Sequence, residues 1–402
     1  MSLFLKLCFS DFYNETRDYR ELSAAMEAGY EVKVLTSVVS SPDENGKVEM
    51  VKGFEVHRFH PVPGVNSKKN KPSNYFMKAL KLMKWVSKVK SFKSDVLSCH
   101  DLTALVVGYA SVLFTKAKSK PKLIYDSHEF ELGRNTVVPR KRIHTWLIKC
   151  VEGFLMKRAD LNMMVNESIA DEVKRIHNLK IQPLVVRNMP PYWKLDLSVC
   201  AERRTELTLL TKAEGDTFFV IYHGAIIENR GIEIFIQAVA ANKNIIGIIM
   251  GYALDEAFMD QLKCVTLELK VSDRIIFLPA VPYEKIWEYV GAADVGLIPV
   301  QNTCMSYYFS LPNKIFESIQ SLTPVITSDF PEMKRIIDKY QIGLTCNQTS
   351  VDSINSCIEK LRTDKGMYNE FKRNLNSAKG DLCWEKEKYV LIDALTKLKV
   401  LL

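Results

Sequence analysis

The chain has 402 residues, enough for two or three domains at roughly 150 residues each. Apolar residues make up 47% and charged residues 25%, and the formal net charge is +8. This composition is typical of a folded protein and excludes a disordered linker or a small disulfide scaffold. The nine cysteines form an odd set with no CxxC or Cys/His metal spacing, so we expect a reducing compartment, no disulfide framework and no metal site.

In chain order, short apolar runs rich in β-branched residues alternate with amphipathic stretches, a pattern that predicts buried parallel strands joined by helices. In the first half these runs fall at 3–9, 32–36, 54–59, 95–99, 122–126, 161–165 and 184–186. In the second half they fall at 218–223, 245–250, 274–278, 295–300, 324–327 and 343–345. The first run is too short for a signal peptide, and no run reaches the roughly 18 to 20 apolar residues that span a bilayer. We therefore expect an α/β protein of two doubly wound domains.

A Pro-Pro pair at 190–191, followed by a polar stretch, places the domain boundary near residue 195. Residues 1–195 then hold 32 Lys and Arg against 20 Asp and Glu, a net charge of +12. Residues 196–402 hold 23 against 27, a net charge of −4. All of the excess positive charge is therefore expected in the first domain.

Two segments of the first domain are basic and amphipathic. Apolar residues recur at helical spacing in 77–93, beside Lys81, Lys84 and Lys88, and again in 139–158, where Pro139 suits a first helical position. Either these stripes pack on the sheet and the cations form a solvated face, or the helices dock on an anionic membrane. Nucleic-acid binding is the weakest alternative because no recognition motif accompanies the charge.

Open α/β sheets bind ligands where their strands end, so polar residues in those loops are candidate site residues. The relevant stretches are SDFYNETR at 10–17, YDSHEF at 125–130, YHGAIIENRGIE at 222–233 and YYFSLPNK at 307–314. Their order and positions resemble the retaining glycosyltransferases of family 4. The resemblance extends over nearly the whole chain. Its most specific parts are HGAIIENRGIE at 223–233 and SLPNKIFESIQSLTPVITSDFPE at 310–332, and GAADVGLIPV at 291–300 and YDSHE at 125–129 support them. It implies the GT-B fold, in which two Rossmann-like domains face each other across a cleft.

The resemblance assigns the donor side to the second domain, residues 196–380. Arg230, at the start of a helix next to the loop that Gly224 opens, would hold the diphosphate of a UDP- or GDP-linked sugar. Asn313 and Lys314 would face the same diphosphate, and Glu317, the second Glu of the family's Glu-x7-Glu signature, would accept hydrogen bonds from the ribose. The resemblance requires no metal and no cofactor.

The acceptor side falls in the first domain, residues 1–195, which a terminal helix from about 380 to 402 would rejoin through Tyr389, Ile392, Leu395 and Leu398. His128 matches the histidine that lines the sugar pocket in relatives, so His128, Arg230 and Glu317 are the candidate catalytic residues. Asp11, Arg17 and Glu129 are candidate acceptor-side residues, with Arg20 nearby.

Two positions depart from the family pattern. The second diphosphate-binding basic residue of the family falls on Ala225, and the first Glu of the signature falls on Phe309. The charge on the diphosphate must then be met by Arg230 and Lys314, and the usual carboxylate contact to the donor sugar is missing.

These observations predict a retaining, metal-independent hexosyltransferase that acts on a lipid-linked saccharide in cell-surface polysaccharide assembly. The basic first domain would hold it against the inner face of the membrane from the cytoplasm. The alternatives are a sugar-nucleotide epimerase of the same fold and a degenerate GT-B subunit that supports a partner enzyme.

Overall fold

In the computed structural model, the chain forms two compact units, and the structure describes residues 1–10, 12–13, 15–37, 45–61, 75–113, 115–116, 120–136, 140–211 and 217–402. The first unit comprises residues 1–132, 136–188 and 387–402, and the second comprises 133–135 and 189–386. Pro139 and part of the segment between 57 and 94 lie outside the described residues.

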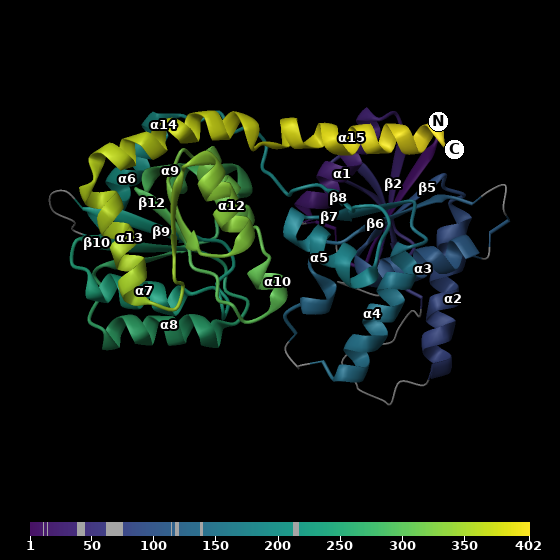
Figure 1. The fold of residues 1–402 in the computed structure, drawn as a ribbon, viewed down its shortest axis with the longest axis horizontal. Helices are drawn as coiled ribbons and strands as arrows, with labels where there is room; N and C mark the ends of the chain where they lie inside the picture. Colours follow the sequence, from purple (N-terminus) through teal and green to yellow (C-terminus); the bar gives the residue numbers. More distant parts are fainter. Residues whose placement is uncertain are drawn as a thin grey trace. The chain divides into compact units, whose positions relative to one another are not determined.

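The first unit contains a sheet with the strand order β3-β4-β2-β1-β5-β6-β7-β8, parallel except for β3 (Figure 1). Its strands are β1 (Leu3–Cys8), β2 (Glu31–Ser37), β3 (Val48–Val51), β4 (Phe54–Phe59), β5 (Val96–His100), β6 (Lys122–Asp126), β7 (Leu161–Met164) and β8 (Leu184–Val185). Its helices are α1 (Thr16–Glu27), α2 (Tyr75–Ser91), α3 (Asp101–Leu113), α4 (Arg142–Met156) and α5 (Glu167–His177). The strand order reverses beside β1, so the ends of β1 and β5 form its switch point.

The second unit is a fully parallel sheet in the order β11-β10-β9-β12-β13-β14, the order of a dinucleotide-binding fold. Its strands are β9 (Phe218–His223), β10 (Ile245–Gly251), β11 (Ile275–Pro279), β12 (Val295–Ile298), β13 (Val325–Ser328) and β14 (Gly343–Cys346). Its helices are α6 (Leu197–Thr211), α7 (Ile232–Ala241), α8 (Glu256–Glu268), α9 (Ile286–Ala292), α10 (Met305–Tyr308), α11 (Asn313–Gln320), α12 (Pro331–Tyr340), α13 (Val351–Thr363) and α14 (Lys365–Asp381).

Strand β9 shows why this sheet is buried on both faces. All six of its residues are buried, and they alternate between two apolar clusters. Phe218, Val220 and Tyr222 pack in the cluster that includes α7 and α13, whereas Phe219 and Ile221 pack in the cluster that includes α9. The rigid strand therefore delivers its last residue, His223, to a fixed point at the carboxyl edge.

From Glu387 onward, the last helix, α15 (Trp384–Val400), belongs to the first unit, together with the two residues that follow it. Its buried residues are Glu387, Leu391, Leu395 and Leu398, and the main-chain oxygen of Leu395 accepts a hydrogen bond from the Tyr30 hydroxyl (2.9 Å). The sequence pattern placed Tyr389 on this stripe, but Tyr389 is exposed because the buried face follows 387, 391, 395 and 398.

Candidate functional site

In the second unit, the polar residues singled out from the sequence meet where β9 and β12 end. Gly224 follows β9 with φ +108°, and its N–H donates to the carbonyl of Met250 (2.8 Å). Gly231 precedes α7 with φ +76°, and a Cβ there would lie 2.1 Å from the Pro299 oxygen. Both positions need glycine because the backbone is left-handed and a neighbour approaches closely.

Arg230 lies between this glycine and the loop, one residue before the N-cap of α7. Its guanidinium carbon lies 4.5 Å from the ring centroid of Tyr307, which belongs to α10. Among the described residues, no carboxylate oxygen lies within 4.0 Å of a guanidinium nitrogen of Arg230. A guanidinium held on an aromatic ring at the start of a helix is suited to binding an anion with two oxygens.

Lys314, in the first turn of α11, is the second cation of this group. Its Nζ lies 3.5 Å from the ring centroid of Tyr222, and its side chain runs against Gly224, where a Cβ would come within 2.8 Å of its Cε. The Tyr222 hydroxyl donates to the carbonyl of Ala225 (2.7 Å), which fixes the turn after β9. Lys314 therefore reaches the segment in which the family usually has its other basic residue.

Glu317 lies one turn further along α11 and is buried. Its carboxylate accepts a hydrogen bond from Nε2 of His223 (2.9 Å), a contact that sequence reasoning missed because the two residues are 94 positions apart. Asn313 is exposed at the start of α11. Phe309 packs on Tyr308, at a centroid distance of 5.3 Å, where the family has a carboxylate.

In the first unit, His128 lies just after β6 and stacks on His100, with the ring centroids 3.6 Å apart. Its Nε2 lies 3.0 Å from the Asp126 carboxylate, and its main-chain N–H donates to Asp101 (3.1 Å). Nδ1 of His100 lies 2.9 Å from Asp18. Burial lowers the pKa of His100, but the hydrogen bond and charge of Asp18 outweigh it and raise that pKa above its ordinary value.

Beneath the two histidines lies a buried ion network. The Lys6 ammonium contacts the carboxylates of Asp18 (3.0 Å), Asp126 (3.2 Å) and Glu21, and all four side chains are buried. Burial opposes the charge on Asp126, but Arg17 and Lys6 hold the pKa of its carboxyl well below the usual range. Burial raises the pKa of Glu21.

The remaining acceptor-side candidates occupy different surroundings. Arg17 is buried, with its guanidinium bound to Asp126 (2.6 Å) and to the carbonyl of Val186 (2.6 Å), so it holds the network together. Glu129 is exposed after β6, Arg20 binds the side chain of Asn188, and Asp11 lies outside the described residues.

The described residues include two groups that could bring three metal-binding atoms together, one made of Asp18, Asp126 and His128 and one of Glu15, His100 and His128. In the first group, the Lys6 ammonium already pairs with both carboxylates, and Arg17 also pairs with Asp126. A dication there would have to displace that ammonium, so the residues do not fit a metal well.

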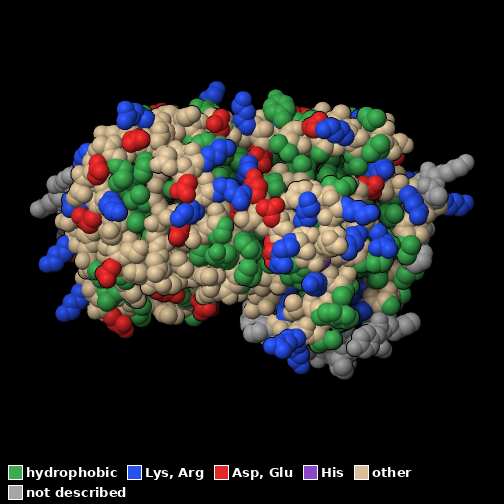
Figure 2. Space-filling view, in the orientation of Figure 1, with side chains coloured by type: hydrophobic (Ala, Val, Ile, Leu, Met, Phe, Trp, Pro, Cys, Tyr) green, Lys and Arg blue, Asp and Glu red, His purple; other side chains and the backbone are tan. Residues whose placement is uncertain are grey.

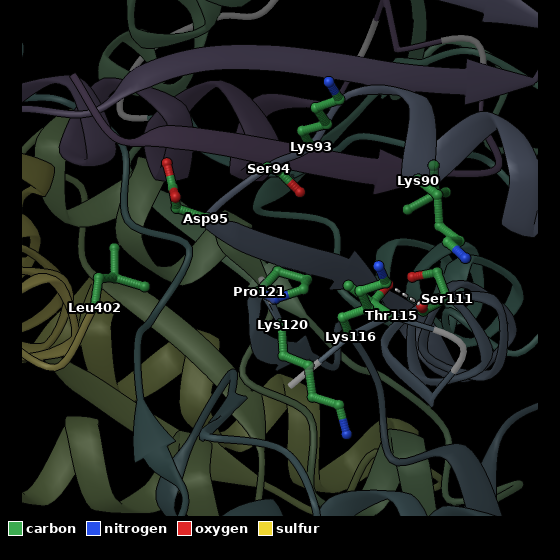
Figure 3. Close-up of a pocket in the computed structure, with 11 residues that line it drawn as sticks. Lys90, Lys93, Ser94, Asp95, Ser111, Thr115, Lys116, Lys120, Pro121 and Leu402 are labelled. Atoms are coloured by element: carbon green, nitrogen blue, oxygen red, sulfur yellow. Dashed lines mark hydrogen bonds between the residues drawn. The ribbon is translucent and has the colours of Figure 1, made fainter. Parts of the chain in front are cut away.

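A cavity of about 720 Å³ lies at the opposite edge of the first unit's sheet (Figure 3). It is lined by four lysines, at 90, 93, 116 and 120, together with Asp95 and Leu402. Ser94 and Asp95 precede β5 and Pro121 precedes β6, so the cavity lies where strands begin. Open parallel sheets bind their substrates where the strands end, so this cavity is not part of the candidate site.

Two parallel α/β sheets, each with polar side chains at its switch point, define the class of sugar-nucleotide-binding GT-B proteins. Residues 210–377 match the family model described as glycosyl transferases group 1, and residues 19–188 match the model described as glycosyltransferase family 4. The uncharacterized glycosyltransferase MJ1607 of Methanocaldococcus jannaschii is 24% identical over 368 residues, which cover 90% of this chain and 86% of that protein.

Solved structures show the same fold. Sucrose-phosphate synthase from Thermosynechococcus elongatus aligns over 100% of both chains with a TM-score of 0.76 and 16% identity. HepE of Anabaena, solved in complex with UDP and glucose, aligns over 100% of both chains with a TM-score of 0.73 and 14% identity. The chain belongs to the group 1, family 4 glycosyltransferases and is a nucleotide-sugar-dependent glycosyltransferase of GT-B fold.

Proposed function

We propose that this glycosyltransferase moves a hexose from a UDP- or GDP-linked sugar to a lipid-linked saccharide with retention of configuration and without a metal. The observation that carries the donor half is the pair of basic side chains, Arg230 and Lys314, that follow the ends of β9 and β12. Arg230 and Lys314 each rest on a tyrosine ring, and neither forms an ion pair within the described part of the chain. Two such cations suit a diphosphate, and HepE, of the same fold, was solved with UDP-glucose.

Each donor-side residue has a role that follows from its place. Arg230 would grip two phosphate oxygens beside the N-terminus of α7, and Lys314 would meet the diphosphate beside the N-terminus of α11. Glu317 would accept hydrogen bonds from the ribose hydroxyls, because a carboxylate held by one bond to His223 keeps further lone pairs. Gly224 would let the backbone approach the phosphates.

In the reaction, the acceptor hydroxyl would attack the anomeric carbon from the face that the diphosphate leaves. The carbon–oxygen bond to the diphosphate breaks, the bond to the acceptor forms, and a phosphate oxygen takes the acceptor proton. The cations would stabilise the charge that develops on the leaving diphosphate. His128 is the candidate for contacting the sugar from the first unit.

The donor assignment is tested with Arg230→Ala, assayed with a panel of UDP- and GDP-sugars. We expect loss of turnover, and partial activity in Arg230→Lys, which keeps the charge but not the two-pronged grip. Arg373→Ala, at an exposed position on α14, is the matched control and should behave as wild type. Normal turnover in Arg230→Ala would refute the assignment.

The same assay separates the alternatives. A transferase releases nucleoside diphosphate only when an acceptor is supplied, whereas an epimerase converts the sugar nucleotide without one. A degenerate subunit binds no donor, which calorimetry with the same panel would reveal. Ala225 and Phe309, which stand where the family has a basic residue and a glutamate, favour the degenerate subunit. Arg230 and Lys314, whose side chains suit a diphosphate, favour a donor-binding enzyme.

The acceptor half of the proposal rests on the two basic helices, α2 and α4, which differ in whether their apolar residues are buried. In α2 the inner stripe packs on the sheet, since Trp85, Val86 and Val89 are buried. In α4 the apolar stripe faces outward, with Trp146 58% and Ile143 57% exposed. Leu147, Val151 and Phe154 on the same helix are also exposed. The sheet-packing alternative therefore accounts for α2 but not for α4.

The charges around the α4 stripe are of one sign. Exposed Lys141, Arg142, Lys149, Lys157 and Arg158 surround it, while the helix's one acidic residue, Glu152, is buried against Tyr125 and His177. Figure 2 shows apolar side chains among Lys and Arg on the face where Figure 1 places α4. Apolar area ringed by cations suits an anionic bilayer, where each cation adds about 1 kcal/mol. No described helix is long and apolar enough to cross a membrane.

We infer that α4 holds the enzyme on the cytoplasmic leaflet, where a lipid-linked acceptor would be presented. All nine cysteines are free thiols, which suits a reducing compartment. The test is flotation with phosphatidylglycerol vesicles, where we expect salt-sensitive binding that is lost in Trp146→Glu/Phe154→Glu. The matched control is Leu209→Glu/Leu210→Glu on α6, at residues 75% and 66% exposed in the second unit. Equal loss in both variants, or no binding by wild type, would refute the role of α4.

A further inference from the structure

The surroundings of Lys314 are unusual for a lysine. Its Nζ lies 3.5 Å above the Tyr222 ring, and its side chain is confined against Gly224. Within the described part of the chain, no carboxylate oxygen lies within 4.0 Å of this nitrogen. Lys314 is half-buried, and an ammonium ion at this position would lack the counter-charge of a neighbouring carboxylate.

The charged groups that face Lys314 do not supply that counter-charge. Arg230, from the loop before α7, is a second cation, and Glu317, one turn along α11, is engaged by His223. Tyr222, from β9, stays a neutral phenol, because burial raises its pKa. Burial and the charge of Arg230 lower the pKa of Lys314 well below its ordinary value, and Glu317 offsets this only in part.

We propose that Lys314 is a neutral amine in the free enzyme and becomes an ammonium ion when the diphosphate of the donor enters the site, so that donor binding takes up one proton. This inference rests on the donor site proposed above. The empty site then carries one permanent charge, on Arg230, and avoids the repulsion between two close cations. The bound diphosphate supplies two negative charges, which makes the charged form of Lys314 the stable one.

The sign of the pH dependence follows from this cycle. Above the pKa of Lys314 in the free enzyme and below its pKa in the complex, each donor that binds takes a proton from the solvent. Donor affinity therefore falls as pH rises, by up to about tenfold per pH unit across that window. A permanently charged residue at position 314 would remove the dependence.

The test is titration calorimetry with UDP-glucose and GDP-mannose at pH 7.0, 8.0 and 9.0, in buffers of different ionisation enthalpy. A sugar nucleotide has no phosphate group that titrates in this range, and the ring N–H of uracil or guanine titrates only from about pH 9 upward. Buffer dependence at pH 7.0 and 8.0 therefore reports on the protein, and at pH 9.0 the contribution of the base is taken from the Lys314→Arg variant. We expect uptake approaching one proton per donor bound at the pH values inside the window. Lys314→Arg should bind donor without proton uptake, since a guanidinium stays charged. Lys314→Met should bind more weakly, also without uptake.

The outcomes separate this inference from the donor assignment. Donor binding whose heat is the same in all buffers at all three pH values would refute the role of Lys314 and leave the donor site standing. Proton uptake that persists in Lys314→Arg would also refute it, because the proton would then belong to another group. Absence of binding with every donor would refute the donor site itself. Circular dichroism of the variants shows that they are folded.

Discussion

Lys6→Met should strongly destabilise the first unit, because it removes the ammonium that contacts three buried carboxylates. Lys6 and Asp18 are fully buried, and their side chains lie 3.0 Å apart. Removing one partner of a buried ion pair typically costs about 3 to 5 kcal/mol. Arg17 would remain as the main cation, and it contacts only Asp126 of the three carboxylates.

The stability that the first unit loses in Lys6→Met should depend on pH, and the direction of that dependence follows from the buried carboxylates. In the wild type, Lys6 holds the pKa of Asp18 below its ordinary value, so this carboxylate stabilises the fold above pH 4 and loses that effect only in acid. Without Lys6, the folded-state pKa of Asp18 rises above its unfolded value, and the pKa of Glu21, which burial already raises in the wild type, rises further. The folded variant then binds more protons than the unfolded chain, so its stability increases as pH falls, by about 1.4 kcal/mol per unit of pKa shift.

The measurement is hydrogen exchange of the β1 and β5 amides at pH 8.0 and 5.5, corrected for intrinsic rates, which reports on the first unit alone. The free energy of opening that Lys6→Met loses relative to wild type should be larger at pH 8.0 than at pH 5.5. Adding Glu21→Gln to the same chain should restore part of that free energy. Lys33→Met is the control, because Lys33 forms only surface pairs with Glu31 and Glu55 on the same sheet. A deficit equal at both pH values, or no larger than that of Lys33→Met, would refute the reasoning.

Three further predictions concern single contacts. Gly231→Ala should lower the thermal midpoint and donor affinity more than Gly53→Ala. Both residues have positive φ, but only at Gly231 would the added Cβ meet an oxygen, at 2.1 Å, so equal effects would contradict the steric argument. His223→Ala should lower the free energy of unfolding of the second unit by about 1 to 3 kcal/mol, because it leaves the buried Glu317 carboxylate without its partner; denaturant unfolding measures this, and no loss of stability would contradict the role of the contact. Leu395→Asp on α15 should destabilise the first unit, measured by β1 amide exchange, whereas Val400→Asp, at an 83% exposed position, should not.

Most strands could be predicted from the sequence because buried parallel strands are continuous apolar runs. Strand β3 is not predicted from the sequence, because its four residues are interrupted by Glu49 and form an antiparallel edge on which Val48 and Met50 are exposed, so they are not a continuous buried run. The two-residue turn at Lys52 and Gly53, both with positive φ, was the available clue to a hairpin. Helix α6 was passed over as a polar stretch because few of its residues are buried.

The candidate site divides in the same way. Arg230, Lys314 and Glu317 could be singled out because each occupies a position in a motif that is recognisable in the sequence by itself. Their supports could not, since Tyr222, Tyr307 and His223 act through contacts that join separate elements. Arg17, a candidate acceptor-side residue because it follows a strand, is buried and binds Asp126, a contact that the sequence does not reveal because the two residues lie 109 positions apart.

The contrast between α2 and α4 shows what the charge of the first domain does and does not establish. Both helices carry lysine or arginine beside an apolar stripe, so composition alone made them equivalent. Burial of Trp85 in α2 explains its apolar face by packing, and its lysines then need no further partner. Exposure of Trp146 in α4 leaves an apolar face that packing does not explain. The membrane proposal therefore depends on α4 rather than on the net charge, and a variant that neutralises α2 lysines while sparing α4 should still float.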